Sequence, residues 1–380
     1  MKRTFKGIGI AVGLVALWLG AHTAPGEPRT ADKPLIQMAI LLDTSSSMSG
    51  LINQARSQIW TVVNEFATTK KDGEIPRLEV GLYEYGKSSL PAKEGYMRMI
   101  LPLTTDLDRV SQELFALGTR GGAEFCGMVI DRATKNLQWS SSNEDMKVIF
   151  IAGNERFTQG NVDYQKACKA AVSRGIVVNT IHCGSENAGI SGKWKDGALL
   201  ADGSFICINM NRRVVHIDAP QDERIAELGI ELNSTYVPYG SAGQAGKQRQ
   251  TAQDSNAAKH AASGAHVQRM VTKANAQYSN AGWDLVDAVR EGAVKVGELD
   301  EEALPEKLQA MTTEERKAYV EEQAQKRARI QEQINQLNSE RQKYVAEKRR
   351  ELEESGEKTL DDAIITALRK QVAAKGFQTE

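Results

Sequence analysis

A run of apolar residues at positions 35–42 ends abruptly at an Asp-x-Ser-x-Ser sequence formed by Asp43, Ser45 and Ser47. Such a run is typical of a buried strand, which would deliver one carboxylate and two hydroxyl groups to the carboxyl edge of a sheet. Open α/β sheets bind their ligands at that edge. Oxygen-only ligands suit a hard divalent cation, and we expect Mg²⁺ first, with Ca²⁺ or Mn²⁺ as alternatives.

The composition limits the classes of function. With 48 Lys and Arg against 49 Asp and Glu, the formal net charge is -1, and the chain has no basic face for nucleic acid. The sequence contains no P-loop, G-x-G-x-x-G, H-E-x-x-H or G-x-S-x-G motif. His182 and His216 fall near the ends of predicted strands, where a histidine is more often structural than part of a hydrolase set. We therefore expect a protein that is not an enzyme and has no small-molecule substrate.

The N-terminal residues 1–24 have the layout of a secretory signal peptide. Lys2, Arg3 and Lys6 precede an apolar stretch that is too short for a membrane helix of roughly 20 residues. We expect export to the periplasm or the exterior, with an uncleaved N-terminal anchor as the alternative. Export permits a disulfide, for which Cys183 and Cys207 are the predicted pair, with buried free thiols as the alternative.

From residue 34 onward, short apolar runs alternate with segments of helical period, which predicts an α/β fold with a doubly wound, mostly parallel sheet. The stretch at 86–95 suggests one antiparallel edge strand. Strands are predicted at 35–42, 78–85, 97–103, 147–152, 175–182 and 204–208, and helices at 51–67, 107–117, 125–138, 163–174 and 221–232.

Near residue 240 the character of the chain changes. Residues 241–265 are rich in Gly, Ala, Ser, Gln and Asn, which indicates a flexible linker, and residues 266–375 form a helical region. Within it, Ile330, Leu337 and Tyr344 are spaced as heptads, whereas Arg341 and Lys348 occupy the companion seam after Ile334. A long solvated helix or helical hairpin and a self-associating coiled coil are the two interpretations. A last amphipathic helix at 359–374 is expected to dock through its apolar residues, which are Leu360, Ile364, Ile365 and Leu368.

The strand, the Asp-x-Ser-x-Ser sequence and the helix that follows resemble the von Willebrand factor A-like (VWA) family over residues 34–240. The resemblance implies a VWA domain at 33–240 with a doubly wound, Rossmann-like sheet. It also implies that Asp43, Ser45 and Ser47 form the first loop of a metal-ion-dependent adhesion site (MIDAS). By analogy the two serine hydroxyls would bind the cation directly, and Asp43 would bind it directly or through water.

Two further loops of the implied site depart from the family pattern. Ala123 stands where a threonine is expected, and Gly153 stands where an aspartate is expected. We expect Glu124 to replace a lost ligand, with Asn154 and Glu155 as further oxygen donors. The alternative is that Glu124 only stabilises the N-terminus of the next helix. The modified site would still hold Mg²⁺, although weakly.

The resemblance implies an exported, non-enzymatic binding or adhesion-type protein. Its cation-assisted face would recruit a protein partner through an acidic residue of that partner. Two alternatives are an accessory subunit of a metal-insertion or chaperone-like enzyme assembly, and a metal-free scaffold that acts through its C-terminal helices.

Overall fold

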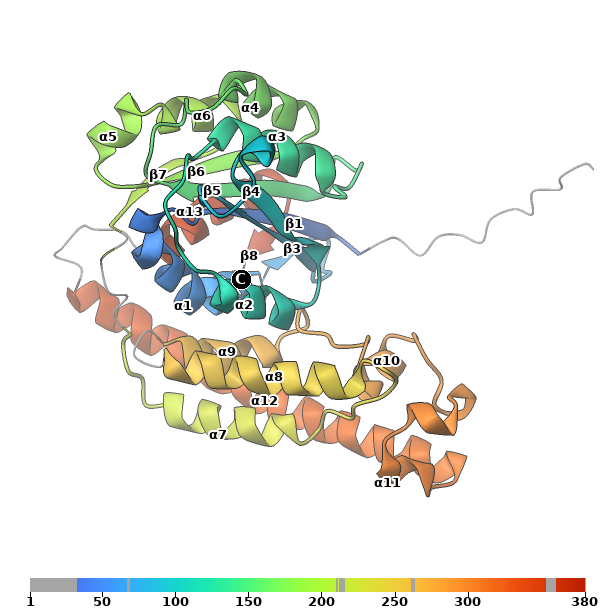
Figure 1. Ribbon diagram of the computed structural model, residues 1–380. Helices are drawn as coiled ribbons and strands as arrows, with labels where there is room; N and C mark the ends of the chain where they lie inside the picture. Colours follow the sequence, from blue (N-terminus) through green and yellow to red (C-terminus); the bar gives the residue numbers. More distant parts are fainter. Residues whose placement is uncertain are drawn as a thin grey trace, which may run out of the picture. The chain divides into compact units, whose positions relative to one another are not determined.

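The computed structural model describes residues 33–66, 69–209, 211, 216–260, 264–352 and 360–379. Residues 33–380 form one compact unit (Figure 1). The predicted signal peptide at 1–24 lies outside the described residues. Within the described ranges, none of the helices combines the length and the apolar character that crossing a membrane requires.

A six-stranded sheet has the strand order β4-β3-β1-β5-β6-β7. Strand β4 is antiparallel to β3, and the other neighbours are parallel. The strands are β1 Leu35–Asp43, β3 Arg77–Tyr85, β4 Met97–Thr104, β5 Met146–Gly153, β6 Val177–Cys183 and β7 Phe205–Ile208. The predicted α/β class and the antiparallel edge strand are therefore confirmed, and each strand boundary falls within two residues of the prediction.

Strand β1 lies at the centre of the sheet and is buried at every position. A strand that is covered on both faces is apolar almost throughout, and Gln37, the polar residue of the run at 35–42, donates hydrogen bonds to Glu79 and to the carbonyl of Gln138. From β1 the chain builds β3 and β4 on one side and β5, β6 and β7 on the other. The direction of winding therefore changes between β1 and β5, and the carboxyl ends of these two strands form the switch point of the sheet.

Helices cover both faces of this sheet (Figure 1). Helices α3 Cys126–Asn136, α4 Tyr164–Ser173 and α6 Trp194–Leu200 contribute to the core on one face. Helices α1 Ser49–Glu65, α2 Leu107–Ala116 and α13 Leu360–Ala374 contribute to the core on the other. The remaining helices are α5 Glu186–Ser191, α7 Asp222–Asn233, α8 Gly243–Lys259, α9 Ala265–Ala274, α10 Leu285–Arg290, α11 Glu306–Gln309 and α12 Thr313–Leu352, with the short 3-10 helices η1 Ser46–Met48, η2 Ala92–Glu94, η4 Val296–Glu298 and η5 Glu301–Ala303.

The predicted flexible linker at 241–265 is wrong for most of its length, because helix α8 occupies it. Its small residues allow close packing: a Cβ atom on Gly246 would lie 2.3 Å from Cγ of Trp283. Its amides make buried hydrogen bonds, from Ser111 Oγ to Gln253 Oε1 (2.9 Å) and from Gln250 Nε2 to the Tyr278 hydroxyl (3.2 Å). A composition that is typical of linkers thus forms a tightly packed helix in this chain.

The heptad spacing in the C-terminal region describes a real buried stripe, but its partners belong to the same chain. Helix α12 packs against α7, α9 and α10. The buried positions recur every three or four residues up to Ile334, at Arg316, Val320, Gln323, Arg327, Ile330 and Ile334, and the stripe continues through the partly buried Leu337 to the buried Arg341. Arg341 donates to Asp222 Oδ1 of α7 at 2.6 Å, so the charge on the seam is paired inside the chain. The heptad stripe is therefore used for packing within the chain, while most other positions of this long helix are exposed; self-association through the helical region stays a prediction.

A buried ionic cluster ties the helical region to the α/β unit. Arg269 of α9 is fully buried and pairs with Asp108 of α2 (2.5 Å) and with Asp254 of α8 (2.9 Å). Its guanidinium also lies over the ring of Trp60 in α1, 4.5 Å from the centroid. Because the cluster joins four helices, the two regions are one folding unit.

The last helix returns to the sheet. Ile364, Ala367, Leu368, Val372 and Phe377 are buried in the core that α1 shares with the strands. Ile365 is half-buried, so the predicted docking is confirmed for Ile364 and Leu368. Two flanking interactions hold the segment: Asn179 and Gln371 exchange amide hydrogen bonds, and β8 Gln378–Thr379 pairs with β2 Thr69–Lys70. Helix α13 therefore belongs to the α/β unit, although it lies after residue 240, where the predicted VWA domain ends.

The predicted disulfide between Cys183 and Cys207 is wrong, because both are free thiols. Cys183 lies opposite Ile208 in the β6–β7 pair, and Cys207 lies opposite His182. The two cysteines are thus one residue out of register. Because successive side chains of a strand point to opposite faces of the sheet, the two thiols lie on opposite faces. Burial raises the pKa of Cys207 to about 11, so it stays protonated at neutral pH.

Candidate metal centre

Asp43 is the last residue of β1 and is fully buried at the switch point. Thr44 N donates to Tyr85 O (2.8 Å), which extends the pairing with β3 by one bond. The Asp43 Oδ1 atom accepts a hydrogen bond from Ser45 N at 2.7 Å. The other carboxylate oxygen, Oδ2, has no hydrogen-bond partner among the described residues. One oxygen thus shapes the turn, and the other is left for a ligand.

The two serines follow in a tight turn before α1 begins at Ser49. Ser45 Oγ and Ser47 Oγ lie 3.2 Å apart. Asn154, which directly follows β5, donates from Nδ2 to Ser47 Oγ at 3.2 Å. Its Oδ1 atom is buried and has no partner in the described part of the chain. The first and third loops therefore meet, as expected for strands that end at one switch point.

Glu124 reaches the same place from the segment before α3. Its side chain is 5% exposed, and its Oε2 atom is unpartnered within the described ranges. A Cβ atom on Gly86 would lie 2.6 Å from Asp43 Oδ1 and 2.7 Å from Glu124 Cγ. The two acidic side chains therefore converge on the space beside Gly86, whose positive φ of 80° suits glycine. A role limited to the N-terminus of α3 does not account for this burial.

Burial makes both carboxyl groups hard to ionise without a cation. It raises the pKa of Asp43 to about 6, although hydrogen bonds from Ser45 oppose the shift. Burial, together with the nearby charge of Asp43, raises the pKa of Glu124 to about 8. Neither carboxylate forms an ion pair with a Lys or Arg among the described residues. Two buried carboxylates without a positive partner are the pattern that a bound cation neutralises.

Gly153 stands in place of the expected aspartate because Tyr85 fills the space. The Tyr85 hydroxyl donates to Ala152 O at 2.9 Å. A Cβ atom on Gly153 would lie only 2.5 Å from that hydroxyl and 3.1 Å from the ring of Trp194. An aspartate at 153 would therefore require Tyr85 to move. Sequence reasoning missed Tyr85 and Gly86, although both end the strand next to β1.

Glu155, the remaining predicted donor, lies at the outer edge of the cluster. Its side chain is exposed and accepts from Gln159 Nε2 at 3.3 Å, while its carbonyl oxygen accepts from Trp194 Nε1 at 2.7 Å. Its charge is close enough to raise the pKa of Asp43. Glu155 therefore influences the candidate site without joining the unpartnered oxygens.

The donor set fits a hard divalent cation. It comprises the carboxylates of Asp43 and Glu124, the hydroxyls of Ser45 and Ser47, and the amide oxygen of Asn154. Three of these residues carry buried oxygens with no partner in the described chain. Mg²⁺, Ca²⁺ and Mn²⁺ take such ligands, whereas no sulfur or imidazole joins the set.

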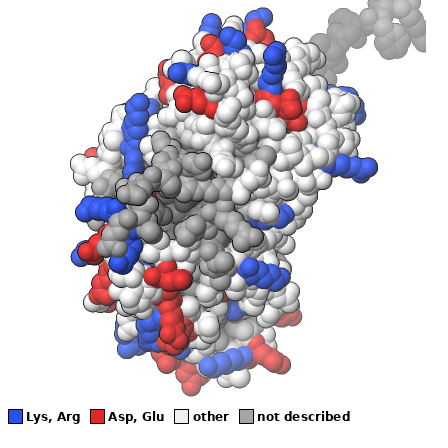
Figure 2. Space-filling model, turned by 90° about the vertical axis from the view of Figure 1, so that its left-hand side faces the viewer, with Lys and Arg blue, Asp and Glu red and all other residues white. Residues whose placement is uncertain are grey.

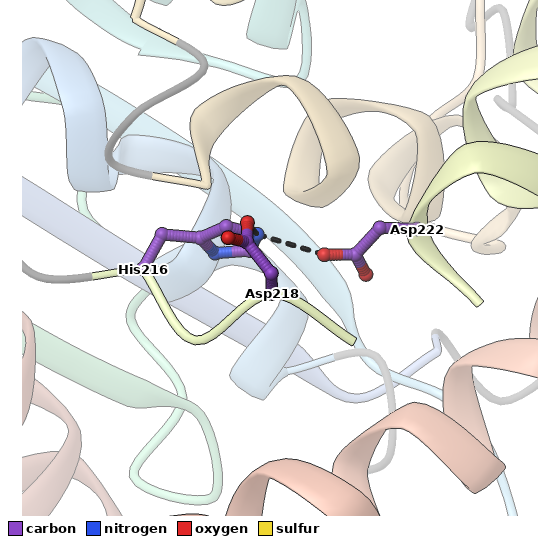
Figure 3. A group of neighbouring side chains, drawn as sticks. All are labelled: His216, Asp218 and Asp222. Carbon is purple, nitrogen blue, oxygen red and sulfur yellow. Dashed lines mark hydrogen bonds and ion pairs between the residues drawn. The ribbon is translucent and has the colours of Figure 1, made fainter. Parts of the chain in front are cut away.

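A second group of possible metal ligands lies before α7 (Figure 3). One ligand atom each from His216, Asp218 and Asp222 lies within 4.8 Å of the others. His216 Nε2 lies 2.7 Å from Asp222 Oδ2, and Arg341 bonds the other oxygen of Asp222. The Asp218 side chain is almost fully exposed. Because Asp222 is already paired through both oxygens, we interpret this group as a structural link between the start of α7 and α12 and not as a metal site.

Among the described residues, the surface around the sheet edge carries no patch of a single charge. The carboxyl ends of the parallel strands lie at the left of Figure 1, where α5 follows β6. Figure 2 shows the molecule from that side, and on its described surface Lys and Arg are interspersed with Asp and Glu. This distribution agrees with the net charge of -1, and the described part of this face offers no basic surface for nucleic acid.

An open α/β sheet with hydroxyl and carboxylate groups at its switch point defines a class of domain built around an oxygen-ligand cation site. Residues 37–189 match the family model of the von Willebrand factor type A domain, and this part of the chain is a VWA domain. VWA domains are adhesion or protein-interaction modules and are generally non-catalytic.

Solved structures similar to this chain each align with just under half of it. BatB from Bacteroides thetaiotaomicron is 17% identical, with 46% of this chain and 90% of that chain covered and a TM-score of 0.35. The SpRpn10 VWA domain is 16% identical, with 46% and 88% covered and a TM-score of 0.35. Proximal thread matrix protein 1 from the mussel byssus, with a zinc-occupied MIDAS motif, is 12% identical, with 46% and 41% covered and a TM-score of 0.35. Comparison with curated proteins gives no match.

Proposed function

We propose that this chain is an exported, non-enzymatic binding protein whose VWA domain recruits a protein partner at the carboxyl edge of its sheet. A divalent cation, Mg²⁺ first, would be held there by Asp43, Ser45, Ser47 and Glu124, with Asn154 as a further donor. The cation would fix the loops that follow β1 and β5 and the segment before α3, and so shape the surface that the partner meets. In a site of this family that stays open, an acidic residue of the partner would be a further ligand.

One observation carries the proposal. Buried oxygens of Asp43, Glu124 and Asn154 converge from three loops, and none has a hydrogen-bond partner among the described residues. Leaving a buried polar group unsatisfied costs about 1–3 kcal/mol, and more for a charged group. This cost is the reason to favour a cation-binding domain over a metal-free scaffold.

Titration of the exported chain with Mg²⁺, Ca²⁺ and Mn²⁺ in a calorimeter tests the cation site. We expect binding by wild type and its loss in Asp43→Ala, because Asp43 is the carboxylate fixed by the turn. Asp131→Ala is the matched control, since Asp131 lies in the same domain and, within the described part of the chain, forms its ion pair with Lys135. Absence of binding by wild type up to millimolar metal would exclude the cation role.

The stabilisation by Mg²⁺ should grow with pH. In the metal-free protein the pKa values of about 6 for Asp43 and about 8 for Glu124 exceed those of unfolded carboxyl groups. The folded state then holds the extra protons, so this contribution is present at low pH and is lost as pH rises through these values. Mg²⁺ replaces the protons, so the gain in Tm over EDTA should be larger near pH 8 than near pH 5.

Thermal unfolding with Mg²⁺ or EDTA across this pH range measures that gain. In the double variant Asp43→Asn, Glu124→Gln, both the gain and its pH dependence should disappear. If the gain in Tm of wild type is the same at all pH values, metal binding is not coupled to proton release.

A further inference from the structure

We propose that Glu124 closes the cation site from within, so that the chain itself supplies the carboxylate that an open site of this kind takes from a partner. This inference rests on the cation binding proposed above. If Glu124 closes the site, the partner would bind the surface around the site, and none of the partner's acidic residues would be bound to the metal.

The charges of the donor set are the first argument. Asp43 alone would leave a divalent cation with one positive charge, which attracts an incoming carboxylate. Glu124 adds the second negative charge, and the other donors, Ser45, Ser47 and Asn154, are neutral. The filled site would therefore carry no net charge. A buried site that is already neutral offers little electrostatic attraction to a further carboxylate, which would also have to shed its water.

The position of Glu124 is the second argument. Its side chain is 5% exposed, so it lies beneath the surface that a partner would touch. It shares the space beside Gly86 with Asp43, and its pKa responds to both Asp43 and Ser45. Glu124 thus lies against the first loop, where an incoming carboxylate would have to bind.

The backbone before α3 is the third argument, because it is held on both sides. Arg120 N donates to Thr44 O (2.9 Å), and Ser88 N donates to Gly121 O (2.7 Å). A Cβ atom on Gly122 would lie 2.5 Å from Gly86 O, so the segment packs directly on the end of β3. Glu124 N donates to Gln159 Oε1 at 3.2 Å. Because the segment is fixed at these points, it holds Glu124 in the site and does not move aside to open a position on the cation.

Mn²⁺ as a probe, with acetate as a stand-in for a partner's carboxylate, tests the closure. Calorimetry gives the affinity, and water-proton relaxation reports the water molecules that remain on the bound ion. For wild type we expect Mn²⁺ to bind with few exchangeable waters and with an affinity that acetate does not raise. Glu124→Gln should bind Mn²⁺ roughly tenfold more weakly or worse, because one charged ligand is lost. Acetate should then restore part of that affinity.

Two variants complete the design. Asp131→Asn is the matched control, because this carboxylate of the same domain pairs with Lys135 and lies outside the donor set, so its loss should leave both readouts unchanged. Glu124→Asp keeps the charge on a shorter side chain; it should weaken Mn²⁺ binding and admit additional water, and it replaces Glu124→Gln as the test if that variant does not fold.

The outcomes separate the two proposals. If wild type binds no Mn²⁺, the cation role in the proposed function fails. If wild type binds Mn²⁺ and acetate raises its affinity, the closure is overturned while the cation role stands. Binding by Glu124→Gln that equals wild type would likewise overturn the assignment of Glu124 as a ligand.

Discussion

A chain truncated after Gly240 is expected to be insoluble or unfolded and not to yield an isolated VWA domain. The truncation removes α13, whose Ile364, Leu368 and Val372, with Phe377 just after it, are buried against α1 and the sheet. At about 1.5–3 kcal/mol for each large apolar side chain, this loss amounts to roughly 6–12 kcal/mol. Typical domains are stable by about 5–15 kcal/mol, so the loss is comparable to the whole stability.

The truncation has a second cost in the α2 helix. It removes Arg269, the partner of the buried Asp108, and so leaves that carboxylate without its positive charge. Soluble expression and circular dichroism of the truncated chain against full length measure the effect. A cooperative thermal transition in the truncated protein, near that of full length, would show that the α/β unit folds without its last helix.

Point variants separate the packing of α13 from the other losses. Leu368→Ala in the full chain should cost about 2–5 kcal/mol, as for other buried leucines. Lys370→Ala, two residues further along the same helix, is the control, because Lys370 is exposed. Equal Tm values for these two variants would contradict the docking of α13.

The sheet could be predicted from the sequence because its signal is local. The central strands β1, β5 and β6 are covered on both faces and appear as short apolar runs, and the order of runs and helical segments indicates the doubly wound topology. The placement of Asp43, Ser45 and Ser47 is equally local, since a turn at the end of β1 delivers all three. The approach of Glu124 to Asp43 could be expected only from its place in the sequence, one residue after the position of the missing threonine.

The helical region could not be assigned because its partners are distant in sequence. The heptad pattern of α12 shows which face is buried, but it does not distinguish a second chain from α7 and α9 of the same chain. Helix α8 lacks large apolar residues because it packs closely on Trp283, and composition alone indicates a linker. The loss of the aspartate at Gly153 depends on Tyr85, which enters the site from another strand.

Replacing Arg327 by methionine is expected to destabilise the chain by about 3–5 kcal/mol, because the buried Asp284 would lose its positive partner and the buried Asp287 would lose one of two, retaining Arg290. Arg327 Nη1 donates to Asp284 Oδ2 (2.7 Å) and to Asp287 Oδ1 (2.8 Å), and all three side chains are buried. Its Nη2 donates to Thr235 O at 2.7 Å, which joins α12 to the end of α7. Since this link is inside the protein, salt should screen it little.

The comparison of variants tests whether paired charge or apolar packing holds α12 in place. Arg329→Met, two residues further along the same helix, changes an exposed arginine and should shift stability by no more than about 0.5 kcal/mol. Adding Asp284→Asn and Asp287→Asn to Arg327→Met should recover part of the loss, because the uncompensated negative charges are then gone. Denaturant unfolding at neutral pH measures all four proteins. If Arg327→Met and Arg329→Met unfold at the same midpoint, the ionic network is not what anchors α12, and the apolar contacts of Ile330 and Ile334 must suffice.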